Sequence, residues 1–551
     1  MGIPTYFSHI VKNHSKIIKK LIELNKSVDN LYLDSNSIIY DVLGKLSKEN
    51  KVYKNIDSFE EVLIKEVCMK IDTYINITRP SNRVIIAFDG VAPVAKLKQQ
   101  RDRRYKSVVE KEIFKNIKND TNKENNTQQK SPEQNNTFNV SKWNKTAITP
   151  GTNFMKKLNE TTKKYFNNYV FDKDVFVEVI VSGTDEEGEG EHKIFEFIRD
   201  NVFEHKSQIT LIYGLDADLI MLCLNHLPIT RNLYLYRETP EFIKSLNSDL
   251  NPNEHYVLDI PMLSREIKIG WNNQYKVGGL NNNNKLYDYI FICFFLGNDF
   301  LPHFPAINIR TKGINILLDA YNAVMDENDY LFKNGVIVWK NVNKFVKYLS
   351  DSEYDNLIDE YKIRNKWEKY SYPCETEEEK YKKYLNLPLK NRSVEKYIDP
   401  YRPYWKNRYY SSLFQNEYNN DFIKKVCMNY LEGLEWVMQY YTFGCIDWRW
   451  KYKYNYPPLM SDLIKYIPQW ECSFLEKKEK NPVTSTVQLG YVLPRNSLYL
   501  IPKNKYIVLL KHVPEYYEDD GYLQWSFCKY IWESHALLPE IDINQLEYLL
   551  N

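Results

Sequence analysis

The chain has 551 residues, of which 43% are hydrophobic and 26% are charged, and its formal net charge is +2. This length exceeds one ordinary hydrophobic core and predicts two or three units with a globular composition. No run approaches the roughly 18 apolar residues that a membrane span needs, and residues 1–9 lack a signal-peptide pattern. The near-neutral charge also excludes a uniformly basic nucleic-acid-binding protein, so any basic patch must be local.

The eight cysteines are scattered along the chain and form no CxxC pair. This distribution argues against a zinc site and against a disulfide framework, and it favours a reducing compartment.

Residues 1–115 alternate strand and helix signals. The apolar run 31–33 ends at Asp34, and the run 84–88 ends at Asp89, with helical patterns between and after them. Residues 116–147 are rich in Asn, Thr, Gln and Lys, and we expect them to form a disordered surface insertion of the first unit.

Beyond the insertion, a helical pattern starts near residue 149 and a β-branched run covers 175–181. An acidic, glycine-rich loop and a helix follow, and then a strand at 209–213. This alternation predicts an α/β fold, in which a mostly parallel twisted sheet carries helices on both faces. We expect a core over residues 1–345, a helical linker over 346–420, and a helix-rich, Trp- and Tyr-rich region over 421–551 that packs on the core.

Seven acidic residues stand out by position, because they follow apolar runs or lie at a loop-to-helix junction: Asp34, Asp89, Glu189, Glu191, Asp216, Asp218 and Asp299. Taken singly, each has a structural explanation, since an Asp after a strand is commonly a helix N-cap and a Glu in a first helical turn suits the helix dipole. Taken together, several of them should converge at the carboxyl edge of one parallel sheet.

Carboxylates gathered in this way repel one another unless cations neutralise them. Mg²⁺ and Mn²⁺ prefer hard oxygen ligands, and a pair of such ions supports hydrolysis of phosphodiesters. The residues alone therefore predict a nuclease or phosphatase that uses two Mg²⁺ or Mn²⁺ ions.

A basic helical face follows Asp89. Pro93 suits a helix start, and the spacing places Lys96, Gln100, Arg103 and Arg104 on one side of that helix. A solvated charged face is the usual explanation for such a run. Its position beside a candidate metal ligand favours a pocket that binds phosphate through charge-assisted hydrogen bonds.

Longer motifs occur in the order MGIP, LYLDSN, AFDGVAPVAKLKQQRDRR, GEGEHKI, YGLDADLI and FLGNDFLPH. They continue with DWRWKYKYNYPPLMSDL, QLGYVLPRNS and WESHALLPEID. In this order the chain resembles the XRN-type 5′→3′ exoribonuclease family over nearly its whole length, apart from the insertion and the linker.

The resemblance implies a PIN/5′-nuclease-like core in which the seven acids bind two metal ions. It implies that Lys96, Gln100, Arg103 and Arg104 form a pocket for a 5′-monophosphate, and that single-stranded RNA is degraded processively to nucleoside 5′-monophosphates, as in mRNA decay. We expect a monomer without membrane association that acts in the cytoplasm, or in the host cytoplasm if the protein is viral, and a nuclear location stays open.

Two features depart from the family pattern. Tyr40 stands where the family usually has a histidine that stacks on the first bases, and Trp448 or Trp450 is a candidate for the opposite stacking face, although core packing is the better single interpretation of each. The chain also ends soon after the second conserved region. This compact length and the abundance of Lys, Asn and Ile fit a large DNA virus or a protist.

Two other functions compete with this one. A flap-type, structure-specific DNA nuclease would share the acidic core, but it typically carries a helix-hairpin-helix element, for which FPAINIRTKG is a poor match. A catalytically inactive RNA-binding scaffold would be expected to have lost some of the seven acids, and all are present.

Overall fold

The computed structural model describes residues 2–24, 26–49, 51–124, 138–170, 177–238, 250–251, 254–274, 283–518 and 521–551. Its centre is a seven-stranded sheet in the order β1-β9-β8-β7-β2-β4-β6. The strands are β1 Ile18–Lys20, β2 Asn30–Asp34, β4 Arg83–Ala87, β6 Glu178–Ser182, β7 Ile209–Tyr213, β8 Asn232–Glu238 and β9 His255–Asp259. Strands β8, β7, β2, β4 and β6 run parallel, whereas β9, toward one edge, is antiparallel to β8, and β1 pairs antiparallel with β9. The predicted mostly parallel sheet is confirmed.

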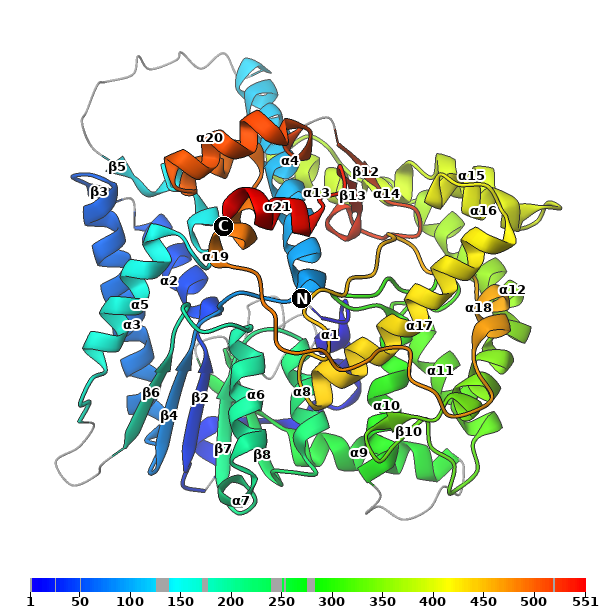
Figure 1. The fold of residues 1–551 in the computed structure, drawn as a ribbon, viewed down its shortest axis with the longest axis horizontal. Coiled ribbons are helices and arrows are strands. Elements are labelled where there is room, and N and C mark those ends of the chain that lie inside the picture. The colour runs from blue at the N-terminus through cyan, green and yellow to red at the C-terminus, as the bar shows by residue number, and fades with distance from the viewer. Residues whose placement is uncertain are drawn as a thin grey trace.

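Side-chain alternation along the strands separates two hydrophobic layers. Leu31 and Leu33 of β2 enter one cluster with α2 Asn36–Lys48, α3 Ile56–Thr78 and α5 Asn153–Tyr165. Tyr32, between them, enters a second cluster on the opposite face, with α6 Gly190–Asp200 and α8 Asp218–His226. The sheet therefore has helices on both faces, as expected, and these helices appear around it in Figure 1.

The second half of the chain is mainly helical and lies beside the sheet in Figure 1. Its helices are α9 Ile260–Gln274, α10 Asn283–Cys293, α11 Gly313–Val324, α12 Trp339–Glu368, α13 Glu377–Leu385, α14 Leu387–Lys390, α15 Ser393–Ile398, α16 Trp405–Phe414, α17 Asn420–Thr442, α18 Met460–Leu463, α19 Ser485–Val492, α20 Lys503–His512 and α21 Ile543–Leu550. Short elements complete the fold: α1 Tyr6–Asn13, α7 Val202–His205 and the hairpins β10 Phe332–Lys333 with β11 Val336–Ile337 and β12 Tyr522–Gln524 with β13 His535–Leu537.

One hydrophobic cluster crosses the predicted unit boundaries at 345 and 420. It starts at Ile3, includes α8, α10, α12 and α17, and reaches Phe527. The division into core, linker and second region stays a prediction. The shared core indicates that these parts stabilise one another rather than fold around separate cores.

Helix α4, Val94–Glu124, lies in the first half of the chain and is hydrogen-bonded to residues between 516 and 539. Arg101 donates to the carbonyls of Pro539 and Tyr516 at 2.7 and 2.9 Å, and Lys106 donates to the carbonyls of Trp532 and Ser534 at 3.0 and 2.8 Å. Helix α4 also packs against α13, α19 and β13. The carboxyl-terminal segment therefore fixes the middle of this helix.

The prediction of a disordered insertion over 116–147 is wrong at both ends of that range. Helix α4 continues through residue 124, and residues 138–147 are ordered. Phe138 and Asn139 form β5, which pairs with β3 Val52–Tyr53, and Trp143 is buried against Phe59. These aromatic contacts outweigh the polar composition, whereas residues 125–137 lie outside the described part of the chain.

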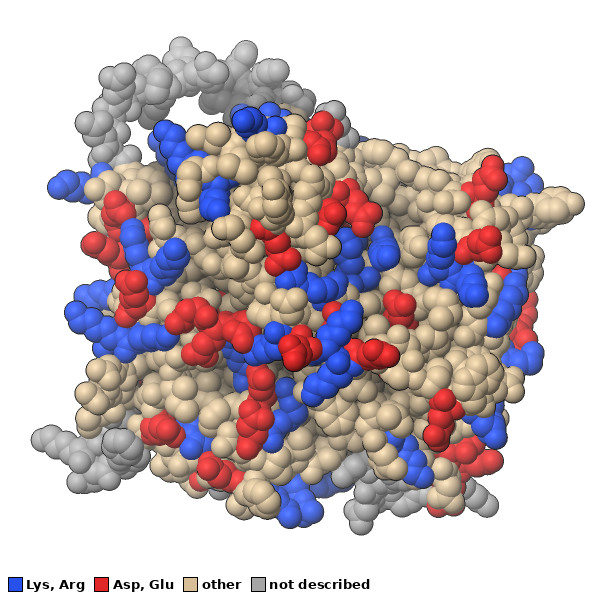
Figure 2. Space-filling model, viewed as in Figure 1, with Lys and Arg blue, Asp and Glu red and all other residues tan. Residues whose placement is uncertain are grey.

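No helix among the described residues has the length and apolar character required to cross a membrane. On the face shown in Figure 2, lysine and arginine side chains are interspersed with acidic ones. This mixture agrees with the small net charge, and it means that cationic sites must be sought around particular elements.

Candidate active site

The seven predicted acids lie on five segments that meet at the carboxyl edge of the parallel strands. Asp34 ends β2 and Asp89 follows β4, while Glu189 and Glu191 open α6, Asp216 and Asp218 open α8, and Asp299 follows α10. Asp34 lies close enough to Asp89, Asp216 and Glu189 to be repelled by their charges. The same repulsion acts between Glu191 and Asp218 and between Asp218 and Asp299. The structure thus brings all seven into one cluster.

Helix capping does not explain most of these positions. The N-cap residues of α2 and α8 are Ser35 and Ala217, not the neighbouring Asp34 and Asp216. Glu189 is the N-cap residue of α6, but its side chain accepts no capping hydrogen bond. Asp89 does accept the backbone N–H of Gly190 at 2.8 Å, and Asn36 also donates to it. The capping explanation therefore applies in part to Asp89 and fails for Asp34, Glu189 and Asp216.

Burial makes the cluster electrostatically unfavourable without cations. Burial and the neighbouring Asp89 hold the pKa of Asp34 well above its usual range, and burial together with Asp218 does the same for Glu191. Burial and Asp299 raise the pKa of Asp218 to about 7. These shifts have the direction expected when like charges share a poorly solvated site.

Lys96 supplies a buried positive charge at the centre of the cluster. Its Nζ lies 2.6 Å from Glu189 Oε2 and 2.8 Å from Asp299 Oδ2. Burial raises the pKa of the Asp299 carboxyl, but Lys96 and the other nearby positive charges, Arg103 among them, together outweigh burial and bring that pKa well below its usual value. Lys96 therefore pairs with the acids, a contact that the helical spacing did not predict.

The other predicted phosphate-binding residues divide between two sides of α4. Gln100 Oε1 and Arg104 Nη1 are buried and have no hydrogen-bond partner in the described ranges, and Arg104 lies close enough to Tyr40 to be influenced by its charge. Arg103 instead lines a cavity beside Asp299. The structure therefore does not bring all four into one pocket, and their role in binding a 5′-phosphate stays a prediction.

The amino-terminal segment completes the cluster, and sequence reasoning missed its position. The backbone N–H of Gly2 donates to Asp299 Oδ1 at 3.1 Å, and Gly2 has a φ of +55°. A Cβ atom built at this residue would lie 1.8 Å from Asp218 Oδ1. Only glycine fits here, and the MGIP motif was the only signal that could have indicated it.

Two tyrosines of α17 also reach the acids without having been predicted. Tyr440 donates to Glu189 Oε1 at 3.0 Å and stacks on His192 with ring centroids 3.7 Å apart. Burial and then the nearby Asp218 raise the pKa of Tyr441 well above its usual value. Residues more than 200 positions away along the sequence thus orient the carboxylates, and no local pattern marks them among the 45 tyrosines.

The candidate stacking residues differ in exposure. Tyr40 is 45% exposed, as a base-stacking residue must be, whereas Trp448 and Trp450 are each 7% exposed. Trp450 stacks on Trp436 at 5.2 Å and donates to Glu432. The two Trp residues are thus core residues, the interpretation the sequence favoured, and contact of either with RNA stays a prediction.

The donor set fits a hard divalent cation. Glu191 Oε2 and Asp218 Oδ1 are buried acceptors that find no hydrogen-bond partner among the residues described, and carboxylate oxygens are the ligands that Mg²⁺ and Mn²⁺ prefer. Among the described residues, no three histidine, cysteine or carboxylate side chains are already arranged as a metal-binding group. The fit therefore rests on the chemistry of the donors, with Lys96 drawing Glu189 and Asp299 to itself.

Protein-family comparisons agree with this geometry. Residues 1–239 match the model described as the XRN 5′-3′ exonuclease N-terminus, and residues 280–396 and 366–550 match the Xrn1 helical domain. The chain belongs to the XRN family. The first match covers six of the seven strands of the sheet, all but β9, and six of the seven acids, and the second covers Asp299 and the helical half.

Curated relatives extend over nearly the whole chain. It is 25% identical to 5′-3′ exoribonuclease 1 of Schizosaccharomyces pombe, 27% to that of Saccharomyces cerevisiae and 28% to that of Homo sapiens, each over 99% of the chain. The matched regions are 48%, 43% and 34% of those XRN relatives, so the chain spans half or less of their length.

Proposed function

We propose that the protein is a processive 5′→3′ exoribonuclease that hydrolyses single-stranded RNA with a 5′-monophosphate to nucleoside 5′-monophosphates. The observation that carries the proposal is the convergence of seven acids at the carboxyl ends of parallel strands, beside the cationic helix α4. The names of the XRN relatives support the direction of cleavage and the RNA substrate.

The seven acids are proposed to hold two Mg²⁺ or Mn²⁺ ions, which, when bound, would promote attack by water and stabilise the leaving oxygen. Asp34, Glu191 and Asp218 are suited to this role because their carboxylates are buried and are repelled by their neighbours. Tyr440 holds Glu189 in place, and Gly2 holds Asp299.

The 5′ end of the RNA is proposed to lie against the side of α4 that carries Gln100 and Arg104. The Nη1 group of Arg104 offers a buried donor to a phosphate oxygen. Tyr40, half-exposed and next to Arg104, is placed to stack on the first base. This side of α4 is proposed to accept a 5′-monophosphate and to exclude a cap or triphosphate, as the resemblance to the family implies.

We propose further that the α/β half is a PIN/5′-nuclease-like domain and that the protein acts as a monomer in the cytoplasm. The parallel order of β8, β7, β2, β4 and β6 with acids at one edge supports the first proposal. The eight cysteines are free thiols, which supports a reducing location.

A degradation assay tests the function directly. One RNA is prepared with 5′-monophosphate, 5′-triphosphate and 5′-hydroxyl ends and incubated with Mg²⁺ or EDTA, beside a single-stranded DNA and a flap DNA. Metal-dependent release of mononucleotides from the monophosphate RNA alone is the expected result. Preferential cleavage of the flap DNA would refute the proposal in favour of a structure-specific DNA nuclease.

Two variants connect the activity to the site. Asp216→Ala should abolish cleavage without unfolding the protein, because Asp216 lies at the exposed edge of the cluster. Arg104→Leu should lose most of the preference for a 5′-monophosphate, whereas Arg495→Leu, a change of the same kind at an exposed arginine, should keep it. Cleavage by Asp216→Ala at the wild-type rate would refute the assignment of the acids.

A further inference from the structure

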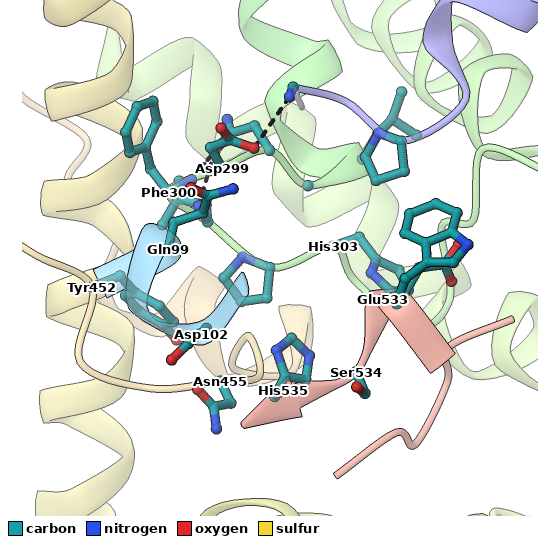
Figure 3. A pocket seen from close by; sticks show the side chains of 18 of the residues that line it. Gln99, Asp102, Asp299, Phe300, His303, Tyr452, Asn455, Glu533, Ser534 and His535 are labelled. Carbon is teal, nitrogen blue, oxygen red and sulfur yellow. Dashed lines mark hydrogen bonds between the residues drawn. The ribbon is translucent and has the colours of Figure 1, made fainter. Parts of the chain in front are cut away.

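A cavity of about 290 Å³ opens beside the acidic cluster, on the side of α4 away from the predicted 5′-phosphate pocket. Its walls come from the start of the chain, from α4, from the segment 296–303 and from the segments 452–455 and 532–535. Figure 3 shows Asp299 and Phe300 at one side of this space and Ser534 and His535 at another. Its volume lies near the lower end of the range typical of small-molecule sites, about 300–1,000 Å³.

Within the part of the chain that the structure describes, three buried polar atoms on the wall of this cavity lack a hydrogen-bond partner: Gln99 Oε1, Asn298 Nδ2 and Ser534 Oγ. The orientation of the Asn298 amide is fixed, because its Oδ1 accepts the backbone N–H groups of Phe300 and Leu301, each at 2.9 Å. Unsatisfied buried polar atoms are unfavourable without a ligand. Together they offer one acceptor and two donors, as the polar edge of a nucleobase requires.

Aromatic side chains complete this part of the wall. Phe300, Tyr452 and Phe527 are buried there, and Trp532 is 38% exposed. Tyr530 stacks on Trp532 at 5.7 Å, and the Arg310 guanidinium lies 5.7 Å from the Trp532 ring. Trp532 is therefore held in place by its neighbours and still presents surface to the cavity, which suits stacking on a base.

The charges of the lining residues favour an anion near the acidic cluster. Lys98 pairs with Asp102, Arg310 with Glu533, and Asp299 with Lys96. Arg103 has no ion pair within the described residues, and its charge acts on Asp299. An unpaired guanidinium is suited to binding a phosphate.

We propose that this cavity binds the nucleoside 5′-monophosphate released by each cleavage. The phosphate lies toward Arg103, and the base lies against Trp532 among Gln99, Asn298 and Ser534. The proposal rests on the proposed exoribonuclease function, because that reaction supplies the ligand next to Asp299. Occupancy by this product inhibits further turnover.

The test measures binding of adenosine and uridine 5′-monophosphates by calorimetry in EDTA, with the corresponding nucleosides and inorganic phosphate as comparison ligands. Trp532→Ala and Gln99→Leu should weaken nucleotide binding at least 5-fold, since base stacking contributes about 1–3 kcal/mol. Trp470→Ala removes a 69% exposed tryptophan outside the cavity and should change nothing. The inhibition constants of the nucleotides in RNA degradation should follow the same order.

Equal affinity of the wild type and both cavity variants would overturn the proposal, and so would binding of inorganic phosphate as tightly as the nucleotides. The two proposals fail in different ways. If the protein degrades RNA but Trp532→Ala and Gln99→Leu bind nucleotides as tightly as wild type, the product site alone is refuted. A protein that binds nucleotides in the expected order but cleaves no RNA would refute the exoribonuclease function and leave the cavity assignment supported.

Discussion

Replacing Gly2 by alanine adds a methyl group inside the acidic cluster. The new Cβ would lie 1.8 Å from Asp218 Oδ1, 2.4 Å from Asp218 Cγ and 2.9 Å from the Asp218 backbone nitrogen. Contacts this short cannot be accommodated by a small rotation, because one of the three atoms belongs to the backbone. We expect the amino-terminal segment to leave its position beside Asp218 and Asp299.

The magnitude follows from two local losses. The φ of +55° at Gly2 costs an L-residue about 1–2 kcal/mol. The hydrogen bond from Gly2 to the Asp299 carboxylate contributes about 1.5–3 kcal/mol, as bonds to charged groups do. A docked segment that loses about 2.5–5 kcal/mol, the sum of both contributions, is displaced in most molecules. Since misplacement by about 1 Å can reduce catalysis 100-fold, we expect kcat/KM to fall 10- to 100-fold.

The assay compares kcat/KM on 5′-monophosphorylated RNA and the unfolding midpoint of wild type, Gly2→Ala and Gly44→Ala. Gly44 lies in α2, and an added Cβ there meets nothing within 4 Å. The control should therefore gain about 0.5–1 kcal/mol of stability and keep its activity within 2-fold. Wild-type activity and an unchanged Mg²⁺ requirement in Gly2→Ala would refute the idea that this segment positions the acids.

Three further predictions concern charge in the folded protein. The first concerns Asp218, whose pKa is raised to about 7 in the folded protein, so the stability that its protonated form provides is lost as pH rises from 3.8 through 7. At pH 7.5 in EDTA, Asp218→Asn should therefore be more stable than wild type by up to about 4 kcal/mol and unfold at a higher temperature, whereas Asp185→Asn should not. A lower unfolding midpoint for Asp218→Asn would contradict this. Lys96→Met leaves the buried Glu189 and Asp299 carboxylates unpaired and should lower the free energy of unfolding by about 3–5 kcal/mol in EDTA, with partial recovery in Mg²⁺. A variant as stable as wild type would show that Lys96 is dispensable. Burial and then Arg199 lower the pKa of His226 to about 3, so the stability that its neutral form provides above pH 6.5 should be lost as pH falls, by about 2 kcal/mol between pH 6.5 and 5. His226→Asn should reduce the change of the unfolding midpoint over this pH range, and an unchanged slope would refute the assignment.

The sequence was informative where a local pattern determines structure. The run 209–213 coincides with β7, and the strands ending near Asp34 and Asp89 are neighbours in the sheet. Parallel strands bring their carboxyl ends to one edge, so the convergence of the acids could be predicted without a structure. The four-residue spacing of Lys96 and Gln100 likewise predicted the helix.

The remaining features depend on contacts between distant parts of the chain. Helical spacing places Lys96 and Gln100 on one face, but the folded positions of Glu189 and Asp299 determine that Lys96 pairs with acids. Tyr440 resembles any other core tyrosine until α17 is packed against α6. The ordered edges of the 116–147 segment depend on pairing with β3 and on burial of Trp143, contacts that a compositional argument does not contain.

The attachment of α4 to the carboxyl-terminal segment has a consequence for synthesis of the protein. Residues 94–124 leave the ribosome almost 400 residues before those around 516–539, whose carbonyls bind Arg101 and Lys106. At about 5–20 residues per second, this interval lasts roughly 20–80 s. During that time the other five acids, which lie between residues 189 and 299, join Asp34 and Asp89 in the nascent chain, but the helix beside them is not yet held in place. Activity should therefore arise only once the segment around 516–539 has docked, which delays attack on RNA, including the message being translated, until that segment has been synthesised.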